Sequence, residues 1–404
     1  MFKFDFEIDE DPEVQELLET QKNTNENVSA SEPASQGDIA GSSTAASFQE
    51  HPLDALLKTL PGTISFSPLH ISTPKGGSLT LPRRDLFDAR FQLISNSSLE
   101  ERNEEQVPEV DELQFVEAPS DLIPGVYEGG LKTWECSLDL AGYLGDYLDS
   151  QATRSTILGK RILELGSGTA IPSMRLIHEA FSQPPNSDRR TAIHMQDYNE
   201  LVFRLAVLPN IILTWYMSPA SATFRESNPH RESTDEDEDT LPPVDPTQSG
   251  DLPLTPALIT AFRQSLDGYN IEIRFFSGSW ETFDLSTAGG KYDVVLTSET
   301  IYRIESLPPL LDLMWRACTQ RTKSLEELTS DMTMSSKEAN SDPEHLCIVA
   351  AKLVYFGVGG GVTEFIDAVQ GANSSSCGRR PGTVESVWKK DEGVKRVILK
   401  VHWK

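Results

Sequence analysis

The residues best suited to bind a small ligand form a glycine turn over 166–170, between a strand pattern and a helical pattern over 171–181. Glycine has no Cβ, so Gly166 and Gly168 let the backbone approach a ligand at the start of the helix. A nucleoside cofactor is the natural ligand for such a turn. An ordinary tight turn explains the motif equally well when it is taken alone, because the dinucleotide fingerprint has a third glycine where this chain has Ala170.

Polar and aromatic side chains also stand at the ends of the first three strand patterns. Glu164 could balance the charge of a methionine ammonium or sulfonium group, or accept structural hydrogen bonds from nearby backbone. Asp197 could accept both ribose hydroxyls of a nucleoside, or cap the helix that follows. Trp280 could line a purine pocket, or pack in the core, since an aromatic face suits both.

Two further segments could contact an acceptor substrate. Glu299 and Tyr302 follow the fourth strand pattern, where Glu299 could accept a proton or hydrogen bond from the acceptor, or only stabilise a helix start. Four glycines within 357–361 follow the fifth strand pattern, directly after Tyr355 and Phe356. They exceed what a turn needs and predict close backbone approach to a substrate segment, with a flexible linker as the weaker alternative.

The elements that must position these residues alternate along the chain. Strands are predicted at 161–165, 192–196, 271–276, 292–297 and 346–355, and helices at 131–148, 171–181, 199–208, 256–266 and 307–316. This alternation predicts an α/β fold with a mostly parallel, doubly wound sheet, whose ligands bind at the carboxyl ends of the strands. The last two strand patterns, 384–388 and 394–403, predict an antiparallel hairpin. Five parallel strands and a terminal hairpin are typical of the seven-strand, Rossmann-like class I methyltransferase architecture.

Composition divides the chain into two parts. Residues 1–120 carry 23 acids and 8 Lys/Arg, a net of −15 out of the chain's −27, and predict a mostly disordered region with short docking elements. Such elements are indicated by alternating apolar residues over 2–8 and by helical leucine spacing over 53–60. The main domain is predicted over 121–404, with solvated loop insertions near 218–252 and 322–343.

Several classes of protein are disfavoured by the sequence. No run approaches the roughly 18 apolar residues that a membrane span requires, and the acidic N-terminus argues against a signal or transit peptide. The four cysteines are scattered and the seven histidines form no constellation, so we expect no metal site, no disulfide framework and a location in the cytoplasm or nucleus. A pI near 4.6 disfavours direct nucleic-acid binding and suits a basic protein partner.

Six motifs, in order, resemble the protein-histidine N-methyltransferase family. They lie at 126–136, 196–199, 208–210, 275–278, 296–302 and 355–361, and the resemblance covers 121–404. It implies S-adenosylmethionine as cofactor and, as substrate, a histidine of an L3-type large-subunit ribosomal protein, free or within a pre-ribosome. It also implies cofactor contacts by Thr133, Trp134, Glu135, Cys136, Ser137, Gly166, Gln196, Asp197, Tyr198, Gly278, Ser279, Trp280 and Ser298.

The chain departs from the family pattern at two places, the glycine turn and Glu164, where many members have Asp. The family's turn reads Gly-Cys-Gly-Ser-Gly, whereas this chain has Ser167 and Ala170 within it. Related lysine methyltransferases have Asp-x-x-Tyr after the fourth strand, whereas Glu299 begins that motif here and favours histidine. No Asn/Asp-Pro-Pro-aromatic motif occurs, which argues against methylation of nucleic-acid bases.

The predicted activity is therefore histidine methylation by a monomer. Glu299 or Tyr302 is expected to hydrogen-bond the non-attacking ring nitrogen, and Tyr355, Phe356, Gly359, Gly360 and Gly361 are expected to contact the substrate. Lysine methylation by a related enzyme and a non-catalytic escort for a ribosomal protein are the alternatives.

Overall fold

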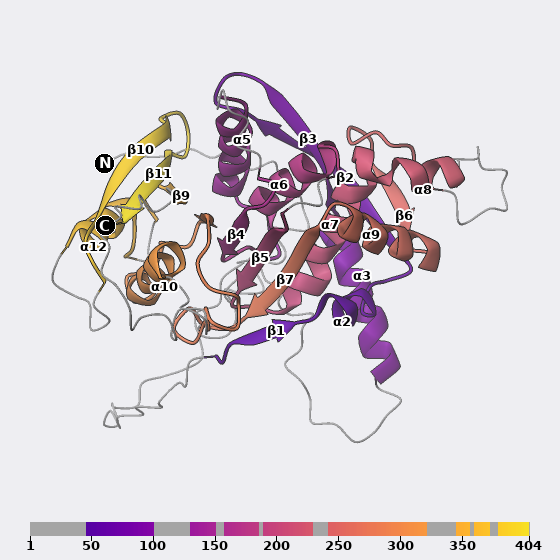
Figure 1. Cartoon of the computed structure of the whole chain (residues 1–404), viewed down its shortest axis with the longest axis horizontal. Coiled ribbons are helices and arrows are strands. Elements are labelled where there is room, and N and C mark those ends of the chain that lie inside the picture. The colour runs from indigo at the N-terminus through magenta and orange to yellow at the C-terminus, as the bar shows by residue number, and fades with distance from the viewer. Residues whose placement is uncertain are drawn as a thin grey trace, which may run out of the picture. The chain divides into compact units, whose positions relative to one another are not determined.

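An eight-stranded mixed sheet organises the residues that the computed structural model describes, which are 46–100, 130–150, 157–185, 189–228, 241–320, 345–355, 359–371 and 379–403. In spatial order the strands are β1 (Gln49–His51), β7 (Ile271–Ser277), β5 (Thr191–Asp197), β4 (Arg161–Leu165), β8 (Val294–Ser298), β9 (Leu346–Lys352), β11 (Arg396–Trp403) and β10 (Gly382–Lys390) (Figure 1). The five strands from β7 to β9 are parallel. β11 is antiparallel to both β9 and β10, and β1 adds an antiparallel edge.

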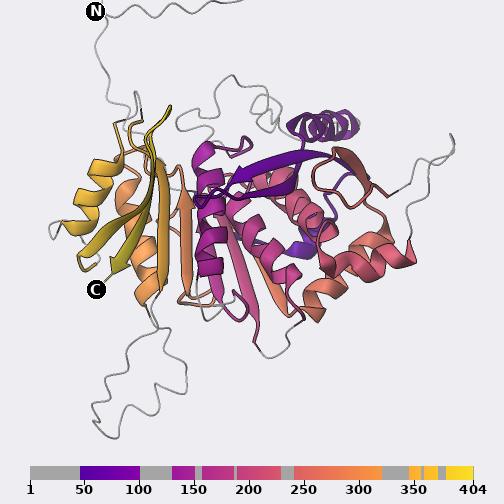
Figure 2. The same cartoon turned by 90° about the horizontal axis from the view of Figure 1, so that it is seen from above.

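Helices cover both faces of this sheet because its strands are apolar on both sides. Neighbouring residues Ile162 and Leu163, for example, are fully buried in two separate hydrophobic clusters. One cluster packs beneath α5 (Glu135–Ser150), α6 (Ile171–Ser182), α7 (Leu208–Tyr216) and α9 (Pro256–Gly268). The other packs beneath α10 (Leu307–Thr319) and α12 (Val362–Gln370), which lie on the opposite side in Figure 2.

The predicted doubly wound architecture is confirmed. All five parallel strands and the terminal hairpin occur within a few residues of their predicted bounds. The helix predicted over 199–208 differs, because a π-helical turn, η1 (Phe203–Val207), leads directly into α7. α12 was not predicted, since its apolar residues follow the glycine-rich segment closely.

The prediction of a mostly disordered region over 1–120 is wrong for residues 46–100. These form β1, α2 (Leu53–Leu57), β2 (Thr63–Ser72), β3 (Ser78–Arg84) and α3 (Leu86–Glu100). β2 is the centre of a second sheet, and its alternating Ile64, Phe66, Leu69 and Ile71 are buried. Averaging the composition over 120 residues concealed this apolar stretch. The alternating residues 2–8 lie outside the described part of the chain.

The first insertion also differs from its prediction. The described part of 218–252 contains η2 (Pro219–Ser221), α8 (Ala222–Ser227) and most of β6 (Gly250–Pro253), which pairs with β2 in the second sheet. Its acidic run and the whole second insertion, 322–343, lie outside the described residues. Within the described ranges, no helix is both long and apolar enough to span a membrane.

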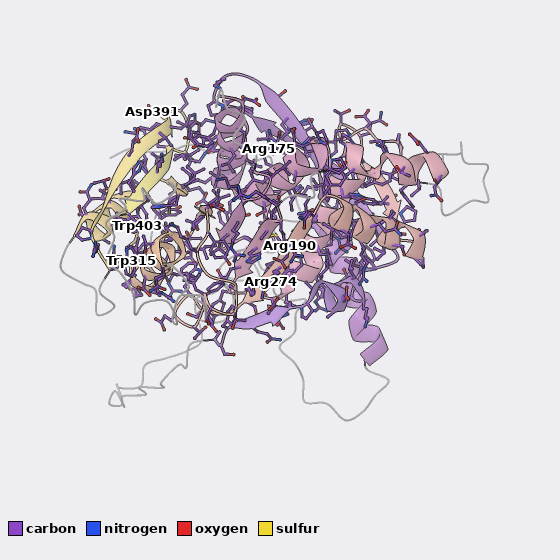
Figure 3. All side chains as sticks on the ribbon, viewed as in Figure 1. Arg175, Arg190, Arg274, Trp315, Asp391 and Trp403 are labelled. Carbon is purple, nitrogen blue, oxygen red and sulfur yellow. The ribbon has the colours of Figure 1, made fainter. Side chains whose placement is uncertain are left out.

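β1 is held to the edge strand β7 by charged and aromatic contacts. Arg274 of β7, labelled in Figure 3, donates to both carboxylate oxygens of Glu50 at 2.7 Å. Phe48 stacks on Phe276 with ring centroids 5.4 Å apart. Beyond the strand, the carbonyl oxygen of Ala46 accepts a hydrogen bond from the Ser279 backbone N–H at 3.1 Å. The segment before β1 therefore supports the loop that follows β7.

Candidate active site

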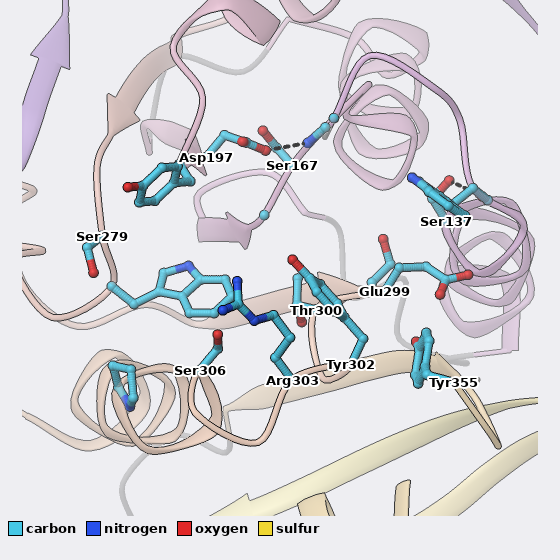
Figure 4. Close-up of a pocket in the computed structure, with 18 of the residues that line it drawn as sticks. Ser137, Ser167, Asp197, Ser279, Glu299, Thr300, Tyr302, Arg303, Ser306 and Tyr355 are labelled. Atoms are coloured by element: carbon cyan, nitrogen blue, oxygen red, sulfur yellow. Dashed lines mark hydrogen bonds between the residues drawn. The ribbon is translucent and has the colours of Figure 1, made fainter. Parts of the chain in front are cut away.

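A cavity of about 310 Å³ lies at the carboxyl ends of the five parallel strands (Figure 4). Its lining comes from the last residues of these strands or the turns that follow them, and from the segments at the starts of α5 and α10. The lining residues are Gly130, Lys132, Trp134, Ser137, Gly166, Ser167, Gly168, Thr169, Asp197, Tyr198, Gly278, Ser279, Trp280, Glu281, Ser298, Glu299, Thr300, Tyr302, Arg303, Glu305, Ser306, Pro309, Lys352 and Tyr355. Thirteen residues that the sequence singled out are among them.

The backbone conformation of the turn over 166–170 requires glycine at two positions. Gly166 and Gly168 have φ angles of 63° and 50°, in the left-handed region that favours glycine. A Cβ on Gly166 would lie 2.6 Å from the Cγ2 atom of Thr300, so the turn is pressed against the end of β8. Ala170 is also left-handed, at φ 56°, and is fully buried at the start of α6. The family's glycine is therefore replaced here by a residue that tolerates this conformation less well.

The Asp197 carboxylate accepts hydrogen bonds from backbone N–H groups and also lines the cavity. Its Oδ2 accepts a hydrogen bond from the Gly168 N–H at 2.8 Å, and its Oδ1 accepts one from the Asn199 N–H at 3.0 Å. The two roles that the sequence left open thus coexist in one carboxylate. Because Asp197 also lines the cavity, its carboxylate lies where it could accept a ribose hydroxyl.

Gln196 positions Trp280 from below the cavity. Gln196 is 1% exposed and does not line the cavity itself. Its Oε1 accepts a hydrogen bond from Trp280 Nε1 at 2.8 Å, and its Nε2 donates to the Gly278 carbonyl at 2.7 Å. These bonds fix the indole of Trp280, which lines the cavity, and its face could contact a purine there.

Glu164 does not line the cavity. It is fully buried under the glycine turn, where its Oε2 accepts hydrogen bonds from the backbone N–H and the hydroxyl of Ser173. Burial raises the pKa of Glu164 to about 8, against the lowering effect of the Ser173 hydrogen bonds. Glu164 therefore accepts structural hydrogen bonds, which was the alternative role predicted for it. Its position beneath the turn does not support a direct contact with the positive charge of a cofactor.

Of the residues predicted to contact the cofactor over 133–137, at the start of α5, only some line the cavity. Trp134 and Ser137 line the cavity, and the Ser137 hydroxyl donates to the Trp134 carbonyl at 2.6 Å. Thr133, Glu135 and Cys136 do not line it. Cys136 is buried, and burial followed by the nearby Glu299 carboxylate raises the pKa of its thiol.

The end of the cavity formed by β8 and β9 holds Glu299 and a residue that the sequence did not single out, Lys352. Glu299 has a left-handed backbone, at φ 57°, and its side chain is only 8% exposed. Such a conformation is unfavourable for a non-glycine residue and often marks functional sites. The Lys352 Nζ lies 3.5 Å from Glu299 Oε1 and 3.2 Å from Glu135 Oε2.

The charge of Lys352 is stabilised by these acids. Burial lowers the pKa of Lys352, but Glu299 and Glu135 outweigh that effect and hold the pKa above its usual value. Tyr355 lies beside this cluster, and burial followed by Glu299 raises the pKa of its phenol. A charged residue at the end of the fifth strand was the signal that could have revealed Lys352.

The glycine-rich segment has a different partner from the one predicted. Gly360 donates its N–H to the Tyr302 carbonyl at 3.0 Å, and a Cβ on Gly360 would lie 2.5 Å from the Tyr302 carbonyl atoms. The close approach is therefore to the chain's own 302–303 segment, and Gly359, Gly360 and Gly361 do not line the cavity. Phe356 lies outside the described residues.

The strand order is that of the class I methyltransferase fold, and this cavity lies at the carboxyl ends of its parallel strands. No family model matches the chain. The chain is 30% identical over 290 residues to histidine protein methyltransferase 1 of Saccharomyces cerevisiae, covering 70% of this chain and 67% of that one. The protein of the same name from Schizosaccharomyces pombe is 28% identical over 338 residues, covering 82% and 79%. The chain belongs to the histidine protein methyltransferase family.

Solved methyltransferase structures also align with the chain, with low sequence identities and low TM-scores. Magnesium protoporphyrin IX methyltransferase from Synechocystis PCC 6803, solved with bound SAH, aligns with 65% of this chain and 81% of its own, at 10% identity and a TM-score of 0.30. A putative O-methyltransferase from Klebsiella pneumoniae aligns with 77% and 97%, at 11% identity and a TM-score of 0.31.

Proposed function

We propose that this chain transfers a methyl group from S-adenosylmethionine to a histidine imidazole of an L3-type large-subunit ribosomal protein. The observation that carries the proposal is that Asp197, Trp280, the glycine turn and Glu299 line one cavity. The chain's membership of the histidine protein methyltransferase family supports the acceptor class. The net charge of −27 suits a basic ribosomal partner in the cytoplasm or nucleus.

The residues present fit the proposed cofactor. S-adenosylmethionine, when bound, supplies an electrophilic methyl group on a sulfonium sulfur. Asp197 would accept hydrogen bonds from the ribose hydroxyls, and Trp280 would contact the adenine. The glycine turn gives the backbone close access to the rest of the nucleoside. These groups are fixed by hydrogen bonds within the protein, so little reorganisation is needed on binding.

Glu299 and Tyr302 both line the cavity, and we assign the orientation of the acceptor to Glu299 because its carboxylate can accept a hydrogen bond from a ring N–H. Imidazole has an unperturbed pKa near 6.5, so most of it is neutral and nucleophilic at pH 7 without a strong base. One ring nitrogen forms the bond to the methyl carbon as the carbon–sulfur bond breaks, with its electron pair remaining on sulfur. The other nitrogen carries the proton, and Glu299 accepts its hydrogen bond and stabilises the imidazolium that forms. That proton then leaves to solvent and gives neutral methylhistidine.

The activity can be tested with purified components. Recombinant L3-type ribosomal protein from the same organism is incubated with the chain and S-adenosylmethionine, and its peptides are analysed by mass spectrometry. A histidine that gains the mass of one CH₂ group supports the proposal, and modification of lysine alone would overturn the choice of acceptor. Calorimetric titration separates a third outcome, since an escort protein without enzymatic activity would show no affinity for S-adenosylmethionine.

A further inference from the structure

The cluster around Lys352 has the composition of a receptor for an alkylammonium ion. The Lys352 Nζ lies 4.6 Å from the centre of the Trp134 ring. Two carboxylates, those of Glu135 and Glu299, lie within 3.5 Å of the same nitrogen. An aromatic face combined with carboxylates is the arrangement by which proteins bind amines with a positive charge. Here the bound ammonium belongs to the chain itself.

This receptor is part of the cavity wall. Trp134, Glu299 and Lys352 all line the cavity, and the Lys352 side chain is 16% exposed. Its parts come from the start of α5, the end of β8 and the end of β9, so the fold assembles it from three distant segments. Partial burial strengthens the attraction between its charges relative to water. A second ammonium would have to enter beside a cation that already holds these partners.

Because the Lys352 ammonium already occupies the receptor, histidine and lysine acceptors are affected differently. With a pKa near 10.4, only about one lysine in 2,500 is neutral at pH 7, so lysine arrives as an ammonium ion and must lose its proton before it can attack the methyl group. A site for lysine therefore benefits from acids that bind the ammonium first. Imidazole is mostly neutral at pH 7 and needs no such receptor.

We propose that Lys352 occupies an internal ammonium receptor and thereby makes the site selective for histidine over lysine. The inference rests on the proposed function and names a residue that determines the acceptor class. Lys352 neutralises one of the two acids, so that the pair no longer attracts a lysine side chain. It also fixes the position of the Glu299 carboxylate, whose Oε1 receives no hydrogen bond from the described residues.

The test compares acceptors that differ at one residue. Its probes are the L3-type ribosomal protein and a variant in which the methylated histidine is replaced by lysine. The rates of methyl transfer to each are measured with wild type, K352M and K352R. Lys132, which lines the same cavity, provides the matched control K132M. Thermal unfolding confirms that each variant is folded, and K352Q replaces K352M if the latter is not.

We expect K352M to raise the ratio of lysine to histidine transfer at least about tenfold, a small part of the interaction between charges a few ångström apart. K352R and K132M should keep the wild-type ratio. Added ethylammonium should occupy the vacated receptor and restore the ratio in K352M. An unchanged ratio in both K352M and K352Q would overturn the inference, as would a large loss of S-adenosylmethionine affinity as their only effect. Failure of wild type to methylate histidine would instead refute the proposed function.

Discussion

Gln196 should control cofactor affinity although it does not line the cavity. Its side chain makes three hydrogen bonds. It accepts from Trp280 Nε1 at 2.8 Å and from the Gly166 N–H at 3.4 Å, and it donates to the Gly278 carbonyl at 2.7 Å. Q196L keeps a similar volume and removes all three bonds. The two short bonds to the 278–280 loop contribute about 1 kcal/mol net each, so Q196L loses about 2 kcal/mol of the free energy that positions this loop. If this loss falls on binding, the Kd for S-adenosylmethionine rises about 30-fold.

Q196E provides a graded comparison for this prediction. Its carboxylate can still accept from Trp280 Nε1, but it has no donor for the Gly278 carbonyl. We therefore expect Q196E to weaken binding about fivefold, between wild type and Q196L. The Kd is measured by isothermal titration calorimetry, with thermal unfolding as the control for folding.

A double-mutant cycle isolates the contact with Trp280. W280F removes the Nε1 donor, so Q196L should cost about 1 kcal/mol less in the W280F background than in wild type. If Q196L binds S-adenosylmethionine within twofold of wild type, or if its effect is equally large beside W280F, the positioning role of Gln196 is refuted.

Three other predictions concern separate parts of the site. E299Q should lower the rate of histidine transfer about 100-fold and reduce selectivity between ring nitrogens, with the Kd for S-adenosylmethionine nearly unchanged; wild-type kinetics would contradict this role. Because the pKa of Glu164 is raised to about 8 in the folded state, its contribution of about 5 kcal/mol is present below about pH 4.5 and is lost as pH rises to about 8. The free energy of unfolding of E164Q, measured in urea across this window, should fall less with pH than that of wild type, and parallel curves would contradict this. Deletion of residues 1–48 leaves β1 in place but removes the Ala46 carbonyl, which accepts a hydrogen bond from the Ser279 N–H. The Kd for S-adenosylmethionine should therefore rise about fivefold relative to deletion of 1–44, and equal affinities would show that the segment before β1 does not support the loop.

Local sequence was sufficient to predict much of the site because short-range patterns specify strand ends. Residues at the carboxyl ends of parallel strands meet at one edge of the sheet, so the positions of Asp197, Trp280 and Glu299 in the chain already predict that they share one cavity. The same reasoning did not reveal which way each side chain points. Glu164 and Gln196 stand at strand ends as well, yet both are buried beneath the cavity and act on backbone or on Trp280.

The sequence by itself determined the order of strands and helices, the glycine turn and the family. These depend on hydrophobic period, glycine placement and motif order, which are local properties of the chain. Only the tertiary structure decided that the segment before β1 supports the loop after β7, that Gly360 packs against Tyr302, and that Lys352 lies between Trp134 and two acids. Each of these contacts joins segments far apart in the chain, and pairings over such separations follow from packing in three dimensions, which residue spacing does not encode.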